Sequence, residues 1–201
     1  MKITVLGAAG EVGRRIVREA ISRGHEVTAV VRRPEQIKTL PEGASHRLCE
    51  VSNAEAVALL CAGQDLIISA VRPPSGDEDQ LVKITQVILQ GAAQSDIRTI
   101  VVGGAASLKM PGQGDTTVLT AKDFLPPSVV SIARACFAQH EMCKADHKAN
   151  WVYFSPPAML VPGIRTGKFR LGSDELVVDK EGVSKISMED FAVAMIDEAE
   201  I

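Results

Sequence analysis

Three glycines near the amino terminus are spaced for contact with a phosphate-bearing ligand. They lie in the segment Gly7-Ala8-Ala9-Gly10-Glu11-Val12-Gly13, between an apolar run at 3–6 and a helical pattern. In a βαβ unit the first glycine permits a tight turn, the second lets a pyrophosphate approach the backbone, and the third lets the helix pack on the strand. The helix N-terminus adds free N–H groups and partial positive charge. The motif therefore predicts a dinucleotide site, against the alternative of a plain β–α turn.

The residues after the second apolar run indicate which dinucleotide is bound. An acidic residue there would hydrogen-bond the adenosine ribose and repel a 2′-phosphate. This chain has Arg32 and Arg33 instead. Guanidinium groups pair with phosphate in a forked geometry, so the pattern favours NADP(H), with Arg32 ahead of Arg33. The alternative is a pair of solvated surface arginines, and NADH stays open as a working donor.

The hydrophobic pattern alternates between short buried strands and amphipathic helices, which predicts a parallel sheet with right-handed crossovers. We expect one α/β domain over residues 1–201, a doubly wound Rossmann fold with strand order 3-2-1-4-5-6 and a ligand across its C-terminal edge. The expected strands are 3–6, 27–31, 46–49, 66–71, 99–102 and 151–154, and the expected helices are 12–21, 54–61, 80–93, 128–149 and 187–200, with a turn or short helix at 34–40.

Two irregular segments, 103–127 and 155–182, are expected to form a small substrate-side region, because they are long and rich in Gly and Pro. A hairpin pairing 169–171 with 176–178 is predicted within the second. Phe124 is a candidate to stack on a planar acceptor, although core packing is the commoner role for an aromatic residue in this chain. Ser107, just after the strand at 99–102, is a weak candidate for a substrate or catalytic group.

Composition excludes several classes of protein. Of 201 residues, 46% are apolar and 23% are charged, which rules out a disordered chain. The net charge of −3 gives no broad attraction to nucleic acid or to an anionic membrane, so neither is expected as a partner. The four cysteines form no C-x-x-C pair, and the first apolar run is too short for a signal peptide, so a cytoplasmic protein with reduced thiols is expected. The pattern leaves monomer and homodimer open.

The glycine loop, the Val-Arg-Arg segment and Glu50-Val51-Ser52-Asn53 together resemble atypical short-chain dehydrogenase/reductases of the NmrA-like kind. The resemblance runs nearly end to end and is strongest to bacterial NADH-flavin reductases and to biliverdin-IXβ (flavin) reductase. The glycine loop is common to a whole superfamily, whereas the later motifs are more specific. These are the segments 103–108, 154–158, 162–168 and 186–192.

The resemblance implies roles for particular positions. Arg32 would take the 2′-phosphate, and Glu50-Val51 would flank adenine, where the family usually has Asp-Val. Pro156 and Pro157 would border the nicotinamide, although strand termination alone would explain them. The residues implied along the pyrophosphate and the rest of the cofactor are Gly7, Ala9, Gly10, Glu11, Val12, Ala70, Val71 and Arg72.

The Y-x-x-x-K motif that many short-chain reductases use to polarise a carbonyl is missing. The one tyrosine, Tyr153, is followed four residues later by Pro157, and the usual Tyr and Lys positions fall near Ala133 and Phe137. Reducing a carbonyl to an alcohol generally needs a proton donor beside the hydride. Reducing a flavin needs less from the protein, since solvent can supply the proton. FMN or riboflavin is therefore expected as acceptor, and no catalytic side chain is predicted.

Two further interpretations remain open. A redox sensor that binds NADP(H) and a protein partner without catalysis would also lack the Tyr and Lys. A metal site is suggested by Cys136, His140, Cys143 and His147, which repeat at i, i+4, i+7 and i+11. Because i and i+11 lie about 16 Å apart along a helix, four ligands from one helix cannot converge on one ion. A half-buried packing face is the favoured interpretation, and no metal is predicted.

Overall fold

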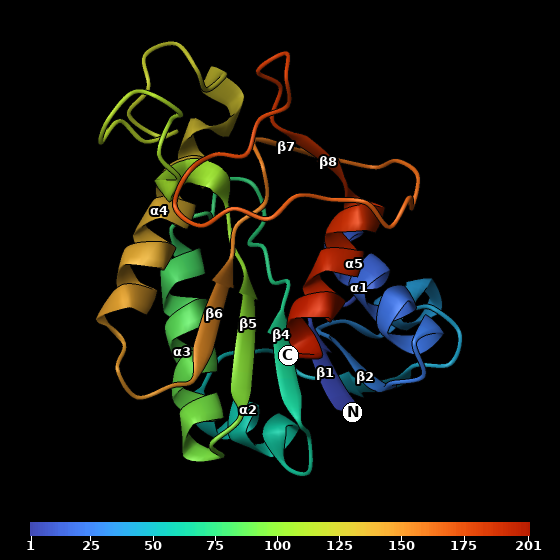
Figure 1. Cartoon of the computed structure of the whole chain (residues 1–201). Helices are drawn as coiled ribbons and strands as arrows, with labels where there is room; N and C mark the ends of the chain where they lie inside the picture. Colours follow the sequence, from blue (N-terminus) through green and yellow to red (C-terminus); the bar gives the residue numbers. More distant parts are fainter.

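A six-stranded parallel sheet forms the centre of the protein, and the computed structural model describes all residues 1–201. Its order is β3-β2-β1-β4-β5-β6, which confirms the predicted 3-2-1-4-5-6 topology (Figure 1). Every neighbouring pair is parallel, as the alternation of strands and helices requires. The strands are β1 (Lys2–Leu6), β2 (Glu26–Val31), β3 (Ser45–Leu48), β4 (Leu66–Ser69), β5 (Arg98–Val102) and β6 (Trp151–Phe154).

Helices cover both faces of the sheet (Figure 1). Alternate residues of the strands face opposite layers: Ile3 and Val5 pack with α1 and α5, whereas Leu6 packs with α2 and α3. Both sets are fully buried, which explains why the strands are continuous apolar runs. The helices are α1 (Glu11–Ser22), α2 (Ala54–Cys61), α3 (Gln80–Gln94), α4 (Val130–Ala145) and α5 (Met188–Ala199), with short 3₁₀ helices η1 (Pro34–Thr39), η2 (Ala105–Ser107) and η3 (Pro127–Val129).

The predicted hairpin in the second half is wrong. Residues 169–171 and 176–178 are not strands, and only the Arg170 side chain reaches the Val178 carbonyl. A separate parallel pair forms instead between β7 (Met159–Val161) and β8 (Lys185–Ser187). A pattern of alternating polarity over only three residues is too short to indicate which segment a strand pairs with. In a parallel pair, the partner strand also lies far away in the sequence, so local pattern does not identify it.

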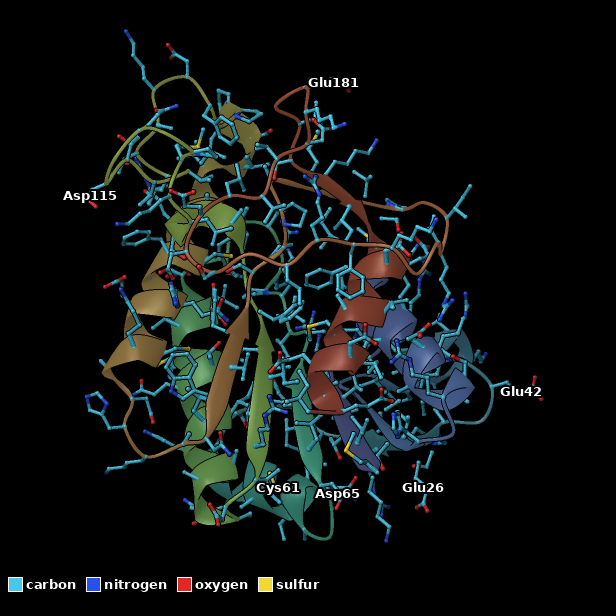
Figure 2. The ribbon with its side chains drawn as sticks, viewed as in Figure 1. Glu26, Glu42, Cys61, Asp65, Asp115 and Glu181 are labelled. Atoms are coloured by element: carbon cyan, nitrogen blue, oxygen red, sulfur yellow. The ribbon has the colours of Figure 1, made fainter.

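The loops at the carboxyl ends of the strands gather at one end of the molecule. Figure 2 shows Asp115 and Glu181, on the loops after β5 and β7, at this end, and Glu26, Cys61 and Asp65 at the opposite end. In a doubly wound sheet, ligands bind at the carboxyl edge of the strands. None of the helices is long and apolar enough to span a bilayer.

A buried carboxylate ties one of these loops to the first helix. Glu19 of α1 is only 5% exposed and accepts two hydrogen bonds from Arg165, at 2.8 and 2.9 Å, and one from Arg23 at 2.8 Å. The hydrogen bonds from Arg165 are the main reason that the pKa of Glu19 lies below its usual value, with burial opposing them. The loop around Arg165 is thus held against α1 by charge.

Replacing this carboxylate should weaken the fold in a pH-dependent way. We expect Glu19→Gln to cost about 2 kcal/mol at pH 7, because the guanidiniums of Arg165 and Arg23 lose their charged acceptor and the glutamine NH2 cannot accept a hydrogen bond in its place. A carboxyl with a lowered folded pKa stabilises the protein above its unfolded pKa of about 4.3, and that contribution is lost as the pH falls through the folded pKa. Denaturant melts of both proteins at pH 7 and pH 3.5 should show the gap between them shrinking in acid. A gap that is constant with pH would contradict the assignment.

Candidate functional site

The turn after β1 has the geometry that the glycine spacing predicts. Gly7 has φ +74°, and a Cβ there would lie 2.6 Å from the carbonyl oxygen of Ala70. A Cβ on Gly13 would lie 2.2 Å from the carbonyl oxygen of Gly7, so this glycine lets α1 pack onto the turn. Gly10 is the exposed N-cap residue that precedes α1, so no side chain covers the helix N-terminus and it is open to a ligand.

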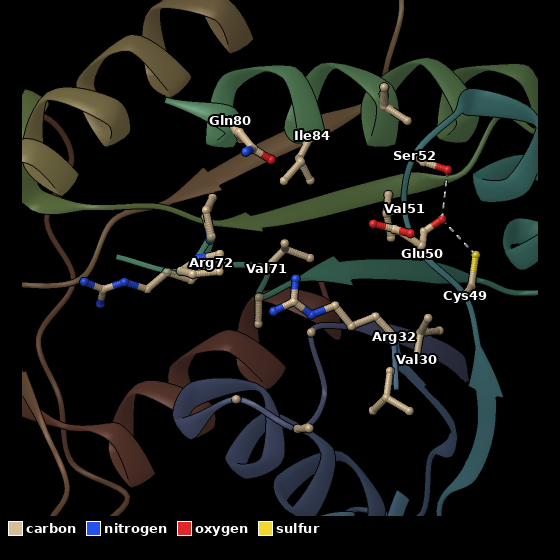
Figure 3. Close-up of a pocket in the computed structure, with 18 of the residues that line it drawn as sticks. Val30, Arg32, Cys49, Glu50, Val51, Ser52, Val71, Arg72, Gln80 and Ile84 are labelled. Atoms are coloured by element: carbon tan, nitrogen blue, oxygen red, sulfur yellow. Dashed lines mark hydrogen bonds between the residues drawn. The ribbon is translucent and has the colours of Figure 1, made fainter. Parts of the chain in front are cut away.

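A cleft of about 390 Å³ opens beside this turn, along the carboxyl ends of β1, β2 and β4. The chain segments after β3 and at the start of α3 form its other walls. In Figure 3, Arg32 extends from the end of β2 into the cleft, with the Glu50–Val51 segment on one side and Gln80 and Ile84 of α3 above. The predicted cofactor residues that line it are Gly7, Ala9, Gly10, Arg32, Glu50, Val51, Ala70, Val71 and Arg72.

The remaining predicted residues lie elsewhere. Val12 and Gly13 belong to the first turn of α1 and pack rather than line the cleft, and Arg33 faces Glu35 at 3.4 Å. Pro156 and Pro157 line a second hollow at the end of β6. The carboxylate of Glu11 is bound by Arg14 at 2.6 Å and Arg15 at 2.9 Å, outside the cleft lining.

The charge of the cleft suits a phosphorylated ligand. Arg32, Arg72 and Lys83 line it against the single carboxylate of Glu50, and none of the three cations makes an ion pair within the chain. Figure 3 shows Arg32 and Arg72 pointing into different parts of the cleft. A glycine-lined turn, an open helix N-terminus and unpaired cations together fit a dinucleotide. A dinucleotide bound here would have its pyrophosphate beside the glycine loop.

Several lining residues were missed by sequence reasoning. Lys83 and Ile84 come from α3, whose apolar periodicity indicates only a packing face. Cys49 and Ser52 flank the Glu50 carbonyl, to which both side chains donate weakly, at 3.4 and 3.5 Å (Figure 3). In the sequence, only their position at the end of the predicted strand 46–49, or a few residues beyond it, could have marked them. The other missed residues are Val30, Val31, Gln36, Pro73, Pro74, Gln80 and Val87.

The second hollow, of about 460 Å³, lies at the carboxyl end of β6 under the segment 168–177. Its floor includes Phe154 and Phe191, and Pro156 and Pro157 form one wall. Asp190 holds the neighbouring loop in place: it is 5% exposed and accepts hydrogen bonds from the Thr166 N–H, the Thr166 hydroxyl and the Gly167 N–H at 2.7–2.8 Å. The loop after β7 is therefore fixed by these hydrogen bonds where it borders the second hollow.

The hydroxyl of the one tyrosine, Tyr153, is hydrogen-bonded in the interior of the protein. The Tyr153 hydroxyl lies 2.9 Å from the Cys136 carbonyl and 3.0 Å from the Gln139 side-chain oxygen, and it accepts from the Gly104 N–H at 3.2 Å. Burial raises the pKa of Tyr153 far above its usual value. Its ring stacks on His140 with centroids 4.5 Å apart. A hydroxyl held in this way is not poised to protonate a substrate.

Neither weak substrate candidate lines the cleft or the second hollow. Ser107, the last residue of η2, pairs its hydroxyl with His140 Nδ1 at 2.8 Å, and burial lowers the pKa of that histidine. Phe124 lies on the loop between η2 and η3 and is 37% exposed. Both stay predictions.

The Cys/His stripe on α4 has packing roles. Cys143 is fully buried, Cys136 packs against Gly104, and burial raises their thiol pKa values to about 12 and about 11. His140 bonds Ser107, and His147 lies beyond the end of α4. No group of three or more His, Cys, Asp or Glu side chains is placed to hold a metal ion.

Comparison with known proteins gives consistent results. The sequence profile of a family described as NAD(P)H-binding matches residues 7–199. YwnB, an uncharacterized protein of Bacillus subtilis, is 31% identical over 204 residues, spanning 100% of this chain and 92% of that protein. A "putative epimerase" structure from Bacteroides thetaiotaomicron is 39% identical with TM-score 0.88, covering 99% of this chain and 90% of its own. A "putative NADH-flavin reductase" structure from Streptococcus pneumoniae is 29% identical with TM-score 0.85, covering 100% and 93%.

Proposed function

This chain belongs to the NAD(P)H-binding family, and from that premise we propose that it is an NADPH-dependent reductase of a flavin or a similar planar conjugated acceptor. The observation that carries the proposal is the cleft beside the glycine turn, where the unpaired Arg32 stands at the position that selects the dinucleotide. The similarity to the NADH-flavin reductase structure from Streptococcus pneumoniae supports the acceptor class.

The lack of a Y-x-x-x-K motif in the sequence supports a flavin over a simple carbonyl as acceptor. Counted along the sequence, Ala133 and Phe137 of α4 fall where a catalytic Tyr and Lys are expected, and Tyr153 is held in the interior. A carbonyl reduction needs a general acid beside the hydride, whereas a reduced flavin takes its proton from water. An epimerase or dehydratase would need the missing groups as well.

In this proposal, the residues of the chain bind and align the cofactor and the acceptor, and none of them takes part in the reaction itself. When bound, NADPH supplies a hydride from its nicotinamide ring. The glycine loop would fix the pyrophosphate, Arg32 the 2′-phosphate, and Pro156 and Pro157 would limit where the ring can lie. Holding the two rings in contact turns a bimolecular transfer into a nearly unimolecular one, which is the main contribution that such a site makes.

NADPH oxidation with and without FMN or riboflavin, beside a direct NADPH binding titration, tests the proposal. Binding together with acceptor-dependent turnover is the expected result. Tight binding with no turnover on any flavin would favour the second candidate, a non-catalytic NADP(H) sensor, which the same missing proton donor supports. Absence of binding would contradict both.

Removing the tyrosine hydroxyl separates a structural from a catalytic role. We expect Tyr153→Phe to cost about 1–2 kcal/mol of stability, because the Gly104 N–H loses its acceptor in a buried setting. Flavin-dependent kcat should stay within about twofold of wild type, since a proton-transfer role would be worth about 10²–10⁴-fold. Chemical denaturation and steady-state rates measure the two effects. A drop of about a hundredfold in kcat would reinstate the tyrosine as an acid.

A further inference from the structure

The second hollow concentrates a scarce type of side chain. Three of the chain's five phenylalanines line it: Phe154, Phe169 and Phe191. The rings of Phe154 and Phe191 are 5.5 Å apart at an interplanar angle of 58°. Phe191 is only 2% exposed and anchors the base of the hollow in the core, whereas Phe154 and Phe169 are half-buried and leave part of their rings open to the hollow. Leu171, also on the lining, is 71% exposed, which leaves an apolar side chain without a partner at the edge of the hollow. Such a surface suits a flat conjugated ring.

The rim of the same hollow is positively charged. Lys168, Arg170 and Lys185 line it against one carboxylate, that of Glu175. None of the three cations forms an ion pair with any carboxylate of the chain. The protein as a whole carries a net charge of −3, so this positive rim is a local departure from the average surface. A ligand that is both planar and anionic would complement it.

The charge on this rim is separate from the charge that faces the cofactor cleft. The cations of the cleft are Arg32, Arg72 and Lys83, and the two sets share no residue. A dinucleotide whose phosphates bind in the cleft therefore gives no role to the three cations of the second hollow. The hollow also lies at the carboxyl edge of the sheet, at the end of β6, where an acceptor would meet a nicotinamide ring.

We propose, on the basis of the reductase function above, that the second hollow is the acceptor site and that its acceptor carries an anionic group. The conjugated ring would lie against the half-buried Phe154 and Phe169, and a phosphate or carboxylate would be held by Lys168, Arg170 and Lys185. Bound NADPH would supply a hydride from its nicotinamide ring to the acceptor ring and become NADP⁺, and water would supply the one proton that completes the two-electron reduction of the acceptor. The anionic group binds and orients the acceptor and takes no part in the transfer.

FMN and riboflavin test this directly, because they share one ring system and differ by a phosphate. The readout is the ratio of KM for FMN to KM for riboflavin, from NADPH oxidation by the full-length protein at low salt. Wild type should prefer FMN. In the triple variant Lys168→Gln, Arg170→Gln, Lys185→Gln the ratio should rise about tenfold, since three partly exposed charge contacts to the phosphate are removed together. Raising the salt concentration should weaken FMN binding more than riboflavin binding.

A matched control removes the same number and kinds of charge elsewhere. Lys2→Gln, Arg47→Gln, Lys148→Gln changes two lysines and one arginine that are exposed and line neither the cleft nor the second hollow. The FMN-to-riboflavin ratio of this variant should match wild type. A ratio that rises equally in both triple variants would overturn the proposal, because general surface charge would then explain the effect.

The remaining outcomes are also informative. A rim variant that still reduces both flavins with the wild-type ratio overturns the anionic acceptor and leaves the reductase function standing. A wild type that reduces neither flavin contradicts the proposed function itself. If the rim variant is poorly folded, quenching of FMN and riboflavin fluorescence by wild type in graded salt gives the same comparison. A comparison of carboxymethylflavin with lumiflavin then distinguishes a carboxylate from a phosphate as the anionic group. Tighter binding of carboxymethylflavin would show that the positive rim accepts a carboxylate. Equal binding of these two flavins, together with a preference for FMN over riboflavin, would restrict the rim to phosphate.

Discussion

Arg32→Glu should reduce NADPH affinity about 100-fold while changing NADH affinity by less than about threefold. A guanidinium-to-phosphate contact is worth about 1.5–3 kcal/mol, and a carboxylate at the same position adds repulsion. Because 1.4 kcal/mol corresponds to a tenfold change in Kd, a loss of about 2.8 kcal/mol follows. Arg32 lines the cleft and forms no internal ion pair, so no other contact of the fold depends on its charge. Fluorescence titration of each nucleotide measures both constants.

Arg33→Glu is the matched control for this prediction. Arg33 is adjacent in sequence, but it is 58% exposed, faces Glu35 and does not line the cleft. Its replacement should change NADPH affinity only a few-fold, through the long-range electrostatic field of the protein. Equal losses in the two variants would mean that overall charge rather than a placed guanidinium governs binding. An Arg32→Glu protein that binds NADPH as tightly as wild type would contradict the cofactor assignment.

The architecture could be predicted because its determinants are local. The run at 3–6, the glycines at 7, 10 and 13, and the helical spacing after them specify one βαβ unit without reference to distant residues. Helix caps are local in the same sense: the Asn53 side chain accepts from the Ala56 N–H, and the Ser187 hydroxyl accepts from the Asp190 N–H. Strand order then follows from the rules for parallel crossovers.

The walls of the site could not be predicted in the same way, because they depend on contacts between distant segments. Lys83 enters the cleft from α3, and Phe191 enters the second hollow from α5, yet both belong to ordinary amphipathic patterns. The β7–β8 pair joins residues that are 26 positions apart in the sequence, through three register positions. The Gly-Pro content of 155–182 indicates a loop, but only the folded chain shows which carboxylates anchor it.

Asp190 is one of these anchors, and Asp190→Ala should destabilise the protein and release the loop after β7 that borders the second hollow. Burial acts to raise the pKa of Asp190, but hydrogen bonds from Thr166 and Gly167 hold it below the usual value, so the buried carboxylate is charged and satisfied. Its removal leaves two backbone N–H groups without an acceptor, at a cost of about 3 kcal/mol. For a domain of this size, that loss should lower Tm by roughly 6–12 °C.

The functional consequence of Asp190→Ala should fall on the acceptor rather than the cofactor. The segment from Thr166 leads directly into Lys168 and Phe169 at the second hollow, whereas the glycine turn belongs to β1 and α1. We expect KM for FMN to rise several-fold, with the Kd for NADPH close to wild type. Asp197→Ala is the control on the same helix, because Asp197 is 46% exposed and pairs with Arg23, and it should cost less than about 1 kcal/mol. Equal effects of Asp190→Ala on both ligands would mean that it disturbs the whole sheet edge, and that the loop is not a separate wall of the acceptor site.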